Sequence, residues 1–461
     1  MITSRIALAL AAGAALGGCK SSPAARSSDA PPGGGDGGGS AIDAPPGDTT
    51  GPLARAANDF LDSLGACTHV GQGVDDPTMS ATALAFAGIR GIRDDGVASH
   101  VGDWIAMHQA AGVRLSLLTD QDVSSTVGMA ESLAAAGALL AVEGPNEPNN
   151  FPVTYNGATS SSTTFMPVAQ LQRDLYAAVH ADAALAGIPV FHSSEAGGSE
   201  PDDVGLQWLV IPTGANATMP DGTPYADYAN THNYVTGTQN TGLVDNNAWG
   251  AEDPVLNGAW DGMYVEYSHT WNKGFAGYAT SDLPAVPRVT TETGWPTQGA
   301  GAITEEQQAR LFLNLYLAAF ARGWSYTFIY MLRDDPTQGY WGLFGTDYSA
   351  KTSGTYVHNL TAILADTPGG AAPGHLNYSI AGEPVTVHDL LLQKADRTFE
   401  LAVWDERADG SADAVAVDLG RSYSTVNVYD PTTGTAPVMT LDDVATVSLT
   451  LSDHPVIIEP H

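Results

Sequence analysis

Cysteine and basic side chains are scarce in this sequence. Of its 461 residues, 2 are Cys and 18 are Lys or Arg, whereas 51 are Asp or Glu, so the formal net charge is −33. Phosphate backbones and anionic lipid surfaces repel a chain of this charge, which argues against nucleic acid or an acidic membrane surface as a partner. The acid excess by itself identifies no substrate.

Several motifs of other enzyme classes are also missing. No Gly-rich phosphate loop follows an expected strand, no His-x-x-x-His pair occurs, and Gly-x-Ser-x-Gly is absent. These absences argue against nucleotide chemistry, a metal centre and a serine-hydrolase elbow. We therefore predict no cofactor and no metal site.

The first 18 residues are typical of an export signal. Arg5 gives a short basic start, and residues 6–16 form an apolar run that is too short to span a bilayer. The next residues, Leu16-Gly17-Gly18-Cys19, resemble the bacterial lipobox. That resemblance implies that residues 1–18 are removed and that Cys19 becomes a lipidated first residue. The alternative, an ordinary secretory signal with an incidental cysteine, gives the same prediction of export.

Residues 19–55 are predicted to form a flexible tether. They consist mostly of Ser, Ala, Pro, Asp and Gly, and so contain almost nothing apolar to bury. With Cys19 carrying lipid, Cys67 is the only thiol left, so no disulfide can form within the chain. We expect an exported monomer anchored to the bacterial cell envelope, at the outer membrane or cell surface, whose only membrane contact is through Cys19.

Residues 56–365 alternate apolar strands with amphipathic helical segments. The expected strands are 66–70, 88–93, 114–118, 139–142, 189–192, 228–232, 288–291 and 326–330. The helical segments between them include 101–111, 127–136, 168–184 and 304–321. Eight strands with mostly helical crossovers predict an α/β fold, the (β/α)8 TIM barrel.

Residues 366–461 have a different pattern. Breaks rich in Pro and Gly are followed by short period-two segments, which are separated by turn signals such as Asp409-Gly410. This pattern predicts a small C-terminal antiparallel β-sandwich. The region has no obvious catalytic cluster, so we expect it to pack against the barrel. Carbohydrate binding is the alternative role.

Two glutamates stand where expected barrel strands end. Gly144-Pro145-Asn146-Glu147-Pro148-Asn149 follows the fourth strand, and Glu292 ends the seventh. Barrel enzymes present catalytic groups at the carboxyl ends of their strands. Because the fourth and seventh strands lie across the barrel mouth from each other, we expect the two carboxyl groups to flank one bond at roughly 5 Å, the separation of a retaining glycosidase.

The Asn146-Glu147-Pro148 motif, with a second glutamate at the end of strand seven, resembles glycoside hydrolase clan A. The resemblance implies that Glu147 is the acid/base, that Glu292 is the nucleophile and that Asn146 contacts the sugar 2-hydroxyl. Residues Glu292-Thr293-Gly294-Trp295-Pro296 are also similar to the nucleophile segment of β-1,3-glucanase families. Asn-Glu-Pro alone is a weak signal, because a strand-to-helix turn favours Asn and Pro for backbone reasons.

Arg93 ends the second expected strand. In the clan, an arginine at this place holds the nucleophile ionised by setting a guanidinium against it. The alternative is a surface arginine paired with Asp94 or Asp95. Glu143, four residues before the acid, is expected to orient Asn146 or Arg93 rather than to attack the substrate.

The sixth expected strand ends in Thr231-His232-Asn233-Tyr234. This segment is similar to a His-x-Tyr pattern of the clan, whose tyrosine can donate a hydrogen bond to the nucleophile. We therefore assign His232 and Tyr234 to the substrate site. For His232, a hydrogen-bonded structural imidazole is the alternative.

Aromatic side chains supply candidates for sugar stacking. Trp295, which follows the nucleophile closely, is predicted to stack on a sugar face, and Tyr340, Trp341 and Trp271 are further candidates, although single aromatics more often pack. Many clan members end strand eight with a tryptophan that forms the floor of the −1 sugar site. Here Tyr330 stands at that place, which departs from the clan pattern and leaves open which contacts form the site.

These observations favour a lipid-anchored retaining glycoside hydrolase that acts on a polysaccharide or oligosaccharide with β-linkages, such as a β-glucan. Two alternatives stay open, a transglycosylase on the same scaffold and a non-catalytic glycan-binding surface lipoprotein. The presence of Asn146, Glu147 and Glu292 argues against the binding protein, because a binder has no need of a proton-shuttling pair.

Overall fold

The computed structural model of the chain describes residues 51–148, 150–161, 166–196, 223–235, 243–251, 287–299, 301–370 and 372–461. The predicted export signal, the lipidation site Cys19 and Trp271 lie outside these ranges. Among the residues that are described, no helix combines the length and the apolar character that crossing a bilayer requires.

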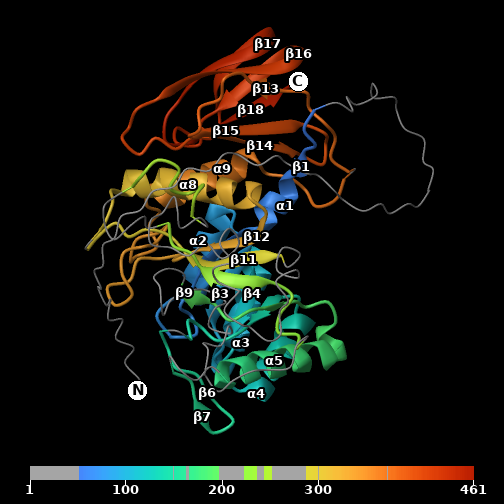
Figure 1. Cartoon of the computed structure of the whole chain (residues 1–461), viewed down its shortest axis with the longest axis vertical. Coiled ribbons are helices and arrows are strands. Elements are labelled where there is room, and N and C mark those ends of the chain that lie inside the picture. Colours follow the sequence, from blue (N-terminus) through green and yellow to red (C-terminus); the bar gives the residue numbers. More distant parts are fainter. Residues whose placement is uncertain are drawn as a thin grey trace, which may run out of the picture. The chain divides into compact units, whose positions relative to one another are not determined.

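A parallel sheet curls into a nearly closed barrel (Figure 1). Its strands are β2 (Leu64–Cys67), β3 (Gly91–Asp95), β4 (Arg114–Leu118), β5 (Leu139–Glu143), β8 (Val190–Phe191), β9 (Glu195–Ala196), β10 (Ala229–His232), β11 (Arg288–Thr293) and β12 (Trp324–Ile329). Their order is β8-β5-β4-β3-β2-β12-β11-β10-β9.

The two short strands β8 and β9 share one position in the ring. β8 pairs with β5, β9 pairs with β10, and a parallel bridge between Phe191 and Tyr228 joins the two edges. The sheet therefore has eight parallel strand positions, and the predicted TIM barrel is confirmed. In this count β5 is the fourth position and β11 is the seventh, as the sequence predicts.

Helices connect the strands and cover the barrel. They are α1 (Ala57–Asp62), α2 (Pro77–Ala87), α3 (Val101–Ala111), α4 (Val123–Ala135), α5 (Met166–Ala181), α8 (Glu305–Ala321) and α9 (Thr352–Ile363), with 3-10 turns η1 (Ala98–His100) and η2 (Ala183–Leu185). Local sequence fixes several of their ends. The Asp76 and Asp122 side chains accept from backbone N–H groups at the starts of α2 and α4, and Thr304 forms a capping box with Gln307 at the start of α8.

A cluster of apolar side chains from five barrel strands, with Met331 beyond β12, forms one of the cores. This cluster includes Cys67, Leu140, Phe191, Val289 and Phe328. The ring of Phe328 on β12 lies so close to β2 that a Cβ at Gly65 would come within 2.4 Å of it. Gly65 therefore leaves the space that Phe328 fills, which is the close packing expected of a barrel core.

The C-terminal residues form a second, mostly antiparallel sheet. Its strands are β1 (Arg55–Ala56), β13 (Ser379–Ile380), β14 (Val387–Gln393), β15 (Phe399–Asp405), β16 (Asp413–Tyr429), β17 (Pro437–Leu451) and β18 (Pro455–Pro460). Val417 and Val428, from the two halves of β16, belong to one apolar core with Leu401 and Val447. The sheet thus folds over a core of its own, which agrees with the predicted antiparallel C-terminal region.

Two further features were not expected from the sequence. β1, at the end of the predicted tether, pairs in parallel with β14 of the C-terminal sheet. A small hairpin of β6 (Thr154–Tyr155) and β7 (Ala158–Thr159) follows the fourth barrel strand. Helix α8 contacts both β12 of the barrel and β14 of the C-terminal sheet (Figure 1), so it connects the two sheets.

Candidate active site

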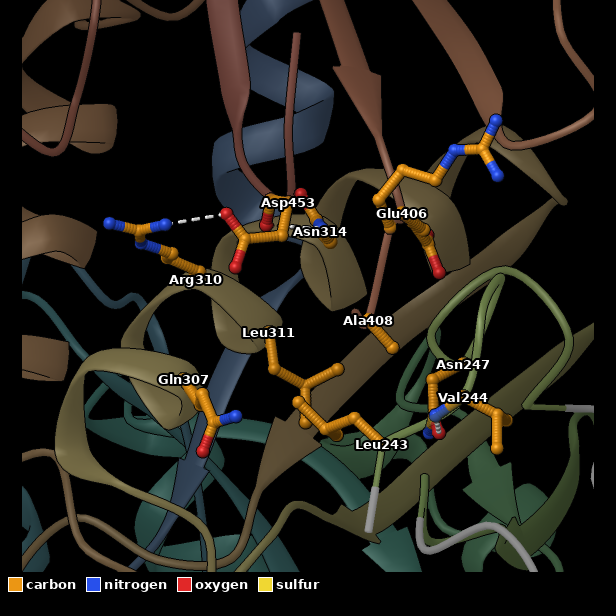
Figure 2. Close-up of a pocket in the computed structure, with 11 residues that line it drawn as sticks. Leu243, Val244, Asn247, Gln307, Arg310, Leu311, Asn314, Glu406, Ala408 and Asp453 are labelled. Atoms are coloured by element: carbon orange, nitrogen blue, oxygen red, sulfur yellow. Dashed lines mark hydrogen bonds and ion pairs between the residues drawn. The ribbon is translucent and has the colours of Figure 1, made fainter. Parts of the chain in front are cut away.

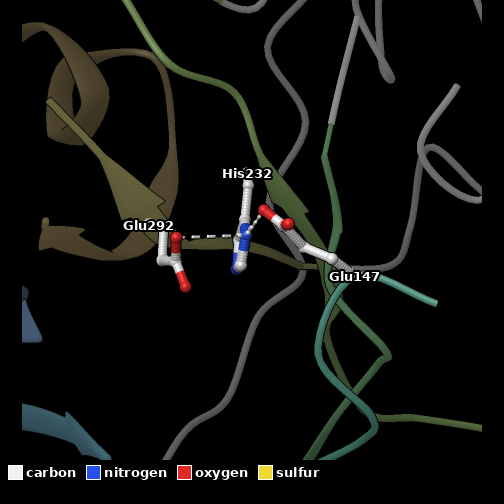
Figure 3. Close-up of side chains that lie close together, drawn as sticks. All are labelled: Glu147, His232 and Glu292. Carbon is white, nitrogen blue, oxygen red and sulfur yellow. Dashed lines mark hydrogen bonds and ion pairs between the residues drawn. The ribbon is translucent and has the colours of Figure 1, made fainter. Parts of the chain in front are cut away.

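The predicted catalytic side chains meet where the parallel strands end. Glu147 follows β5, His232 ends β10 and Glu292 lies near the end of β11. Each offers one ligand atom, and these three atoms lie within 4.8 Å of one another (Figure 3). Parallel barrel strands present their carboxyl ends on one face, so residues far apart in the sequence meet at this mouth.

Arg93 on β3 ties the site together. Its Nε donates to Glu143 at 3.0 Å, and its two terminal nitrogens donate to Glu292 Oε1 at 2.5 Å and to Asn146 Oδ1 at 2.7 Å. Arg93 is buried, so the alternative of a surface arginine is wrong. Burial opposes its charge, yet the carboxylates of Glu143 and Glu292 raise the pKa of Arg93 well above its ordinary value. A guanidinium bonded in this way gives Glu292 a charge-assisted hydrogen bond.

Glu143 is fully buried, with 0% of its surface exposed. Besides Arg93 it accepts hydrogen bonds from Ser116 Oγ at 3.1 Å, from Thr291 Oγ1 at 2.9 Å and from Asn230 Nδ2 at 3.3 Å. These donors satisfy its oxygens and hold Arg93 in place. The expectation that Glu143 orients Arg93 is confirmed.

Glu147 has the environment of a general acid. Its Oε1 lies 2.7 Å from His232 Nδ1, and its Oε2 accepts from Asn150 Nδ2 at 3.0 Å. Burial raises the pKa of Glu147, although Asn150 and Arg93 act in the opposite direction. The backbone of Glu147 is left-handed, with φ of +37°, a strained conformation that is rare outside glycine and is often found at functional sites.

His232 is fully buried between the two glutamates. Its Nδ1 is 3.5 Å from Glu292 Oε2 as well as 2.7 Å from Glu147, and its Nε2 is 3.1 Å from Thr291 Oγ1. Burial lowers its pKa to about 4, with Glu292 acting in the opposite direction. The imidazole is therefore neutral near pH 7. When Glu147 is protonated, Nδ1 can accept its hydrogen bond while Nε2 donates to Thr291.

Tyr234 and Tyr330 lie beside Glu292. The Tyr234 hydroxyl donates to Glu292 Oε2 at 2.7 Å, as the sequence predicts. Burial and the neighbouring Glu292 raise the pKa of Tyr234 well above its ordinary value, so the hydroxyl stays a donor. The rings of Tyr234, Tyr330 and Trp341 meet edge to face, with centroids 5.4–6.5 Å apart. We call these three half-buried rings the aromatic wall.

The prediction that Trp295 stacks on a sugar is wrong. Only 2% of its surface is exposed, it packs in the main apolar core, and its Nε1 donates to the Gly301 carbonyl at 2.7 Å. The cause lies in Gly294, whose φ of +152° turns the chain immediately after β11. A Cβ there would come within 2.7 Å of the Tyr330 carbonyl oxygen, so the turn requires glycine and carries Trp295 away from the mouth.

Asn146 is placed by Arg93. Its Oδ1 accepts from the guanidinium, so the Nδ2 amide is the end that can donate to a substrate hydroxyl. The sequence interpretation missed Ser116, Asn150, Asn230 and Thr291. A signal was present for Ser116, because it is a polar residue inside the otherwise mostly apolar strand β4.

Within the described part of the chain, one group of side chains has the geometry to hold a metal ion, and it is Glu147, His232 and Glu292. The Arg93 guanidinium already bonds Glu292, and its positive charge opposes a second cation there. A hydrogen bond accounts for the close approach of His232 to Glu147, and Arg93 and Tyr234 hold Glu292 beside them. The donor set therefore gives no reason to add a metal to the chemistry.

Solved structures with a similar fold include two with a TM-score of 0.50 or above. The GH51 arabinofuranosidase from Xanthomonas axonopodis pv. citri has 12% sequence identity and a TM-score of 0.54, over 90% of this chain and 98% of that one. SrfJ from Salmonella typhimurium has 10% identity and a TM-score of 0.50, over 89% and 90%. No family model and no curated protein matches the sequence. At such identities the similarity establishes the fold alone, a TIM barrel with an accompanying β-sheet.

Proposed function

We propose that the protein is a retaining glycoside hydrolase, with Glu292 as nucleophile and Glu147 as acid/base. One observation carries this proposal. Glu147 follows the fourth strand position and Glu292 lies near the end of the seventh, and a carboxylate oxygen of one is within 4.8 Å of a carboxylate oxygen of the other. Retaining glycosidases hold their two carboxyl groups about 5–5.5 Å apart, too close for a water molecule to attack directly between them.

The first half of the reaction forms a glycosyl-enzyme. A Glu292 oxygen attacks the anomeric carbon while the bond to the leaving oxygen breaks and Glu147 gives its proton to that oxygen. Arg93 and Tyr234 hold the carboxylate of Glu292 and fix which oxygen faces the sugar. The raised pKa of Glu147 keeps it protonated at a pH where an ordinary carboxyl group is ionised.

The second half releases the sugar. Glu147, now ionised, takes a proton from water, and the resulting hydroxide oxygen attacks the anomeric carbon as the bond to Glu292 breaks. Two displacements at one carbon restore its configuration. The neutral imidazole of His232 lies against Glu147, so the residue in direct contact with the acid adds no positive charge as the proton passes on and off.

A β-linked glycan, with β-glucan favoured, is the substrate class that we propose. The similarity of residues 292–296 to β-1,3-glucanase segments supports β-glucan, and the aromatic wall supports stacking against a sugar ring. The fold is also shared with a GH51 arabinofuranosidase, so arabinofuranosides belong among the test substrates.

The test is a reducing-end release assay on β-1,3-, β-1,4- and mixed-linkage glucans, mannan, xylan and arabinan. Wild type is compared with Glu147→Gln and Glu292→Gln, and the first-formed anomer is followed by NMR. We expect one polymer class to be cleaved with retention and both variants to be inactive on it. Inverted product, or full activity in Glu292→Gln, would contradict the proposal.

Two alternatives have distinct outcomes in the same assay. Longer oligosaccharides from an oligosaccharide substrate, with little reducing-end release, would identify a transglycosylase on the same catalytic pair. Binding of a glycan by wild type without cleavage of any polymer would instead identify a surface glycan-binding protein. In that case Glu147→Gln would leave the dissociation constant nearly unchanged.

We also propose that the protein is exported and anchored by lipid on Cys19. The support is the lipobox-like Leu16-Gly17-Gly18-Cys19 after a short apolar run. In a bacterial host supplied with labelled palmitate, the wild-type protein should carry label and partition into detergent. Cys19→Ser should be unlabelled and should not be retained in the membrane fraction, whereas Cys67→Ser is the matched control and should remain labelled.

A further inference from the structure

The C-terminal sheet holds a segment that belongs to the barrel's connection between β10 and β11. This segment is residues 243–251, and Figure 2 shows Val244 and Asn247 near Glu406. Glu406 directly follows β15 and is buried, and its carboxylate accepts from the backbone N–H of Ala248 at 2.9 Å and of Trp249 at 3.1 Å. Burying a carboxylate costs free energy unless it is hydrogen-bonded. The two backbone N–H groups of the segment therefore stabilise the buried Glu406.

A second set of contacts fixes the same segment to the sheet. The ring of Trp249 stacks on His388 of β14, with centroids 4.1 Å apart and planes at 8°. His388 Nε2 lies 2.9 Å from Asn246 Oδ1, and the Asp245 carboxylate accepts from the Ala408 backbone N–H at 2.9 Å. Backbone, aromatic and amide contacts thus bind the segment to the C-terminal sheet.

The other side of the segment reaches the active site through Asn247. This side chain is buried, with 3% of its surface exposed. Its Oδ1 accepts from the Val244 N–H at 3.2 Å, and its Nδ2 donates to the backbone carbonyl of Val235. Val235 directly follows Tyr234, whose hydroxyl donates to the Glu292 carboxylate at 2.7 Å. A continuous chain of contacts therefore runs from Glu406 to the nucleophile.

We propose that the C-terminal sheet positions the nucleophile, acting from Glu406 through Asn247 and Tyr234 on Glu292. This inference rests on the proposed function, because it assigns the sheet a part in orienting the group that attacks the sugar. Glu406 and Asn247 are positioning residues, since neither directly contacts Glu147 or Glu292. Removing one of these contacts allows the Tyr234 hydroxyl to move away from Glu292. A misplacement of about 1 Å can lower the rate up to about a hundredfold.

A double-mutant cycle, assayed with the substrate that wild type cleaves, tests whether Asn247 acts on the reaction through Tyr234. Asn247→Asp keeps the acceptor for Val244 but loses the donor to Val235, and Tyr234→Phe removes the last link. We expect Asn247→Asp to lower kcat about tenfold with KM within about twofold, and to lower it little further in the Tyr234→Phe background. An unchanged kcat, or losses that multiply in the double variant, would overturn the proposal.

Asn314→Ala is the matched control. Asn314 on α8 is buried at the same junction of barrel and sheet, and its Nδ2 donates to the Asp453 carbonyl at 2.9 Å. This shorter contact lies outside the path from Glu406 to Tyr234, and the longer one of Nδ2, 3.5 Å to the Asp405 carbonyl, reaches only the backbone before Glu406 and not its carboxylate. We expect Asn314→Ala to lower Tm while kcat stays within about twofold of wild type. A kcat loss equal to that of Asn247→Asp would mean that both variants act through general loosening.

Hydrogen exchange gives a readout that needs no activity. In Glu406→Gln, peptides covering residues 229–235 should exchange at least about tenfold faster than in wild type, while peptides covering β3 stay unchanged. Unchanged exchange at 229–235 would overturn the proposed link even if the protein is an active glycosidase. Faster exchange in a protein that cleaves no glycan would instead support the link and contradict the proposed function.

Discussion

Two histidines with little exposed surface, one at the barrel mouth and one beside the C-terminal sheet, each lie against two carboxyl groups, yet their pKa values move in opposite directions. His232 lies 2.7 Å from Glu147 and 3.5 Å from Glu292, and its burial lowers its pKa to about 4. His454 lies 3.5 Å from both Asp430 and Asp453. Burial opposes its charge too, but hydrogen bonds to the two aspartates raise its pKa to about 9.

The difference comes from the charge that each imidazole meets. At the mouth, Arg93 already bonds the carboxylates of Glu143 and Glu292, and the raised pKa of Glu147 favours its neutral form. Beside the sheet, Arg310 bonds Asp453 at 2.6 Å, but among the described residues no guanidinium forms an ion pair with Asp430, whose pKa is lowered, despite its burial, by its contact with His454. The His454 side chain also keeps 17% of its surface exposed, against 0% for His232, so burial opposes its charge less. A neutral imidazole can share a proton with an acid, whereas an imidazolium between two carboxylates acts as a structural clamp.

The largest expected effect comes from removing the proposed nucleophile. Glu292→Gln keeps the shape of the side chain but cannot form a glycosyl ester, so kcat should fall by about 10⁴-fold or more. Steady-state kinetics on the cleaved polymer measures the loss. Denaturant unfolding is the control. The variant should unfold at nearly the wild-type denaturant concentration, which shows that the loss of kcat is a loss of chemistry and not of folding.

Removing the acid should cost about 10²–10⁴-fold in kcat on a polymer. With an aryl glycoside that has a good leaving group, Glu147→Gln should form the glycosyl-enzyme at nearly the wild-type rate, because that leaving group needs no proton. Pre-steady-state burst measurements separate the two steps. Equal losses on both substrates would remove Glu147 from the acid role.

The pH dependence has a definite sign. Glu147 must be protonated for the first step, and burial raises its pKa, so kcat/KM should fall as the pH rises through a value above the ordinary carboxyl range. This alkaline limb should be absent from Glu147→Gln assayed on the activated glycoside. A limb that persists in the variant would assign it to another group.

Substituting His232 sharpens the comparison of the two histidines. His232→Gln removes the neutral ring that contacts Glu147, and we expect kcat to fall about ten- to a hundredfold, the cost of leaving a buried polar group without its partner. The alkaline limb of the pH profile should move as well. If the pH profile of the rate were unchanged and only the stability fell, His232 would have a purely structural role.

The smallest effect on activity is expected at His454. Its folded-state pKa is about 9 and lies above the ordinary histidine pKa of 6.5, so its contribution to stability is complete below about pH 6.5 and is lost as the pH rises through about 9. This shift corresponds to about 3 kcal/mol at most. Urea unfolding between pH 6 and 10 should show the decline in wild type and a flatter curve in His454→Gln, with kcat at pH 6 unchanged. A wild-type curve as flat as that of the variant would contradict the clamp.

Much of the barrel and of its mouth could be predicted from the sequence. Apolar strands that end in polar residues gave the eight positions, and the ordinals of those strands gave the facing pair Glu147 and Glu292. The contacts of Arg93 and Tyr234 with Glu292 also agree with the clan pattern. These predictions worked because strand ends in a parallel barrel meet on one face whatever their distance in sequence.

The sequence could not predict contacts that depend on a single turn or on a distant partner. Trp295 is two residues after Thr293, the last residue of β11, but the glycine turn at Gly294 directs it into the core. The attachment of Ala248 to Glu406 joins residues 158 positions apart, one in the connection between β10 and β11 and the other directly after β15. No local periodicity encodes such a contact, and a glutamate after a strand looks the same in the sequence whether it serves chemistry or packing.

Direct trapping of the covalent intermediate is the most decisive measurement. The probe is a 2-deoxy-2-fluoro glycoside of the sugar that wild type cleaves, with a good leaving group. It should inactivate the enzyme, and the mass of each protein molecule should rise by the mass of one fluorosugar. Peptide mapping should then place the sugar on Glu292, and Glu292→Gln should remain unlabelled. A label on Glu147 or on any other residue would contradict the assignment of Glu292 as the nucleophile.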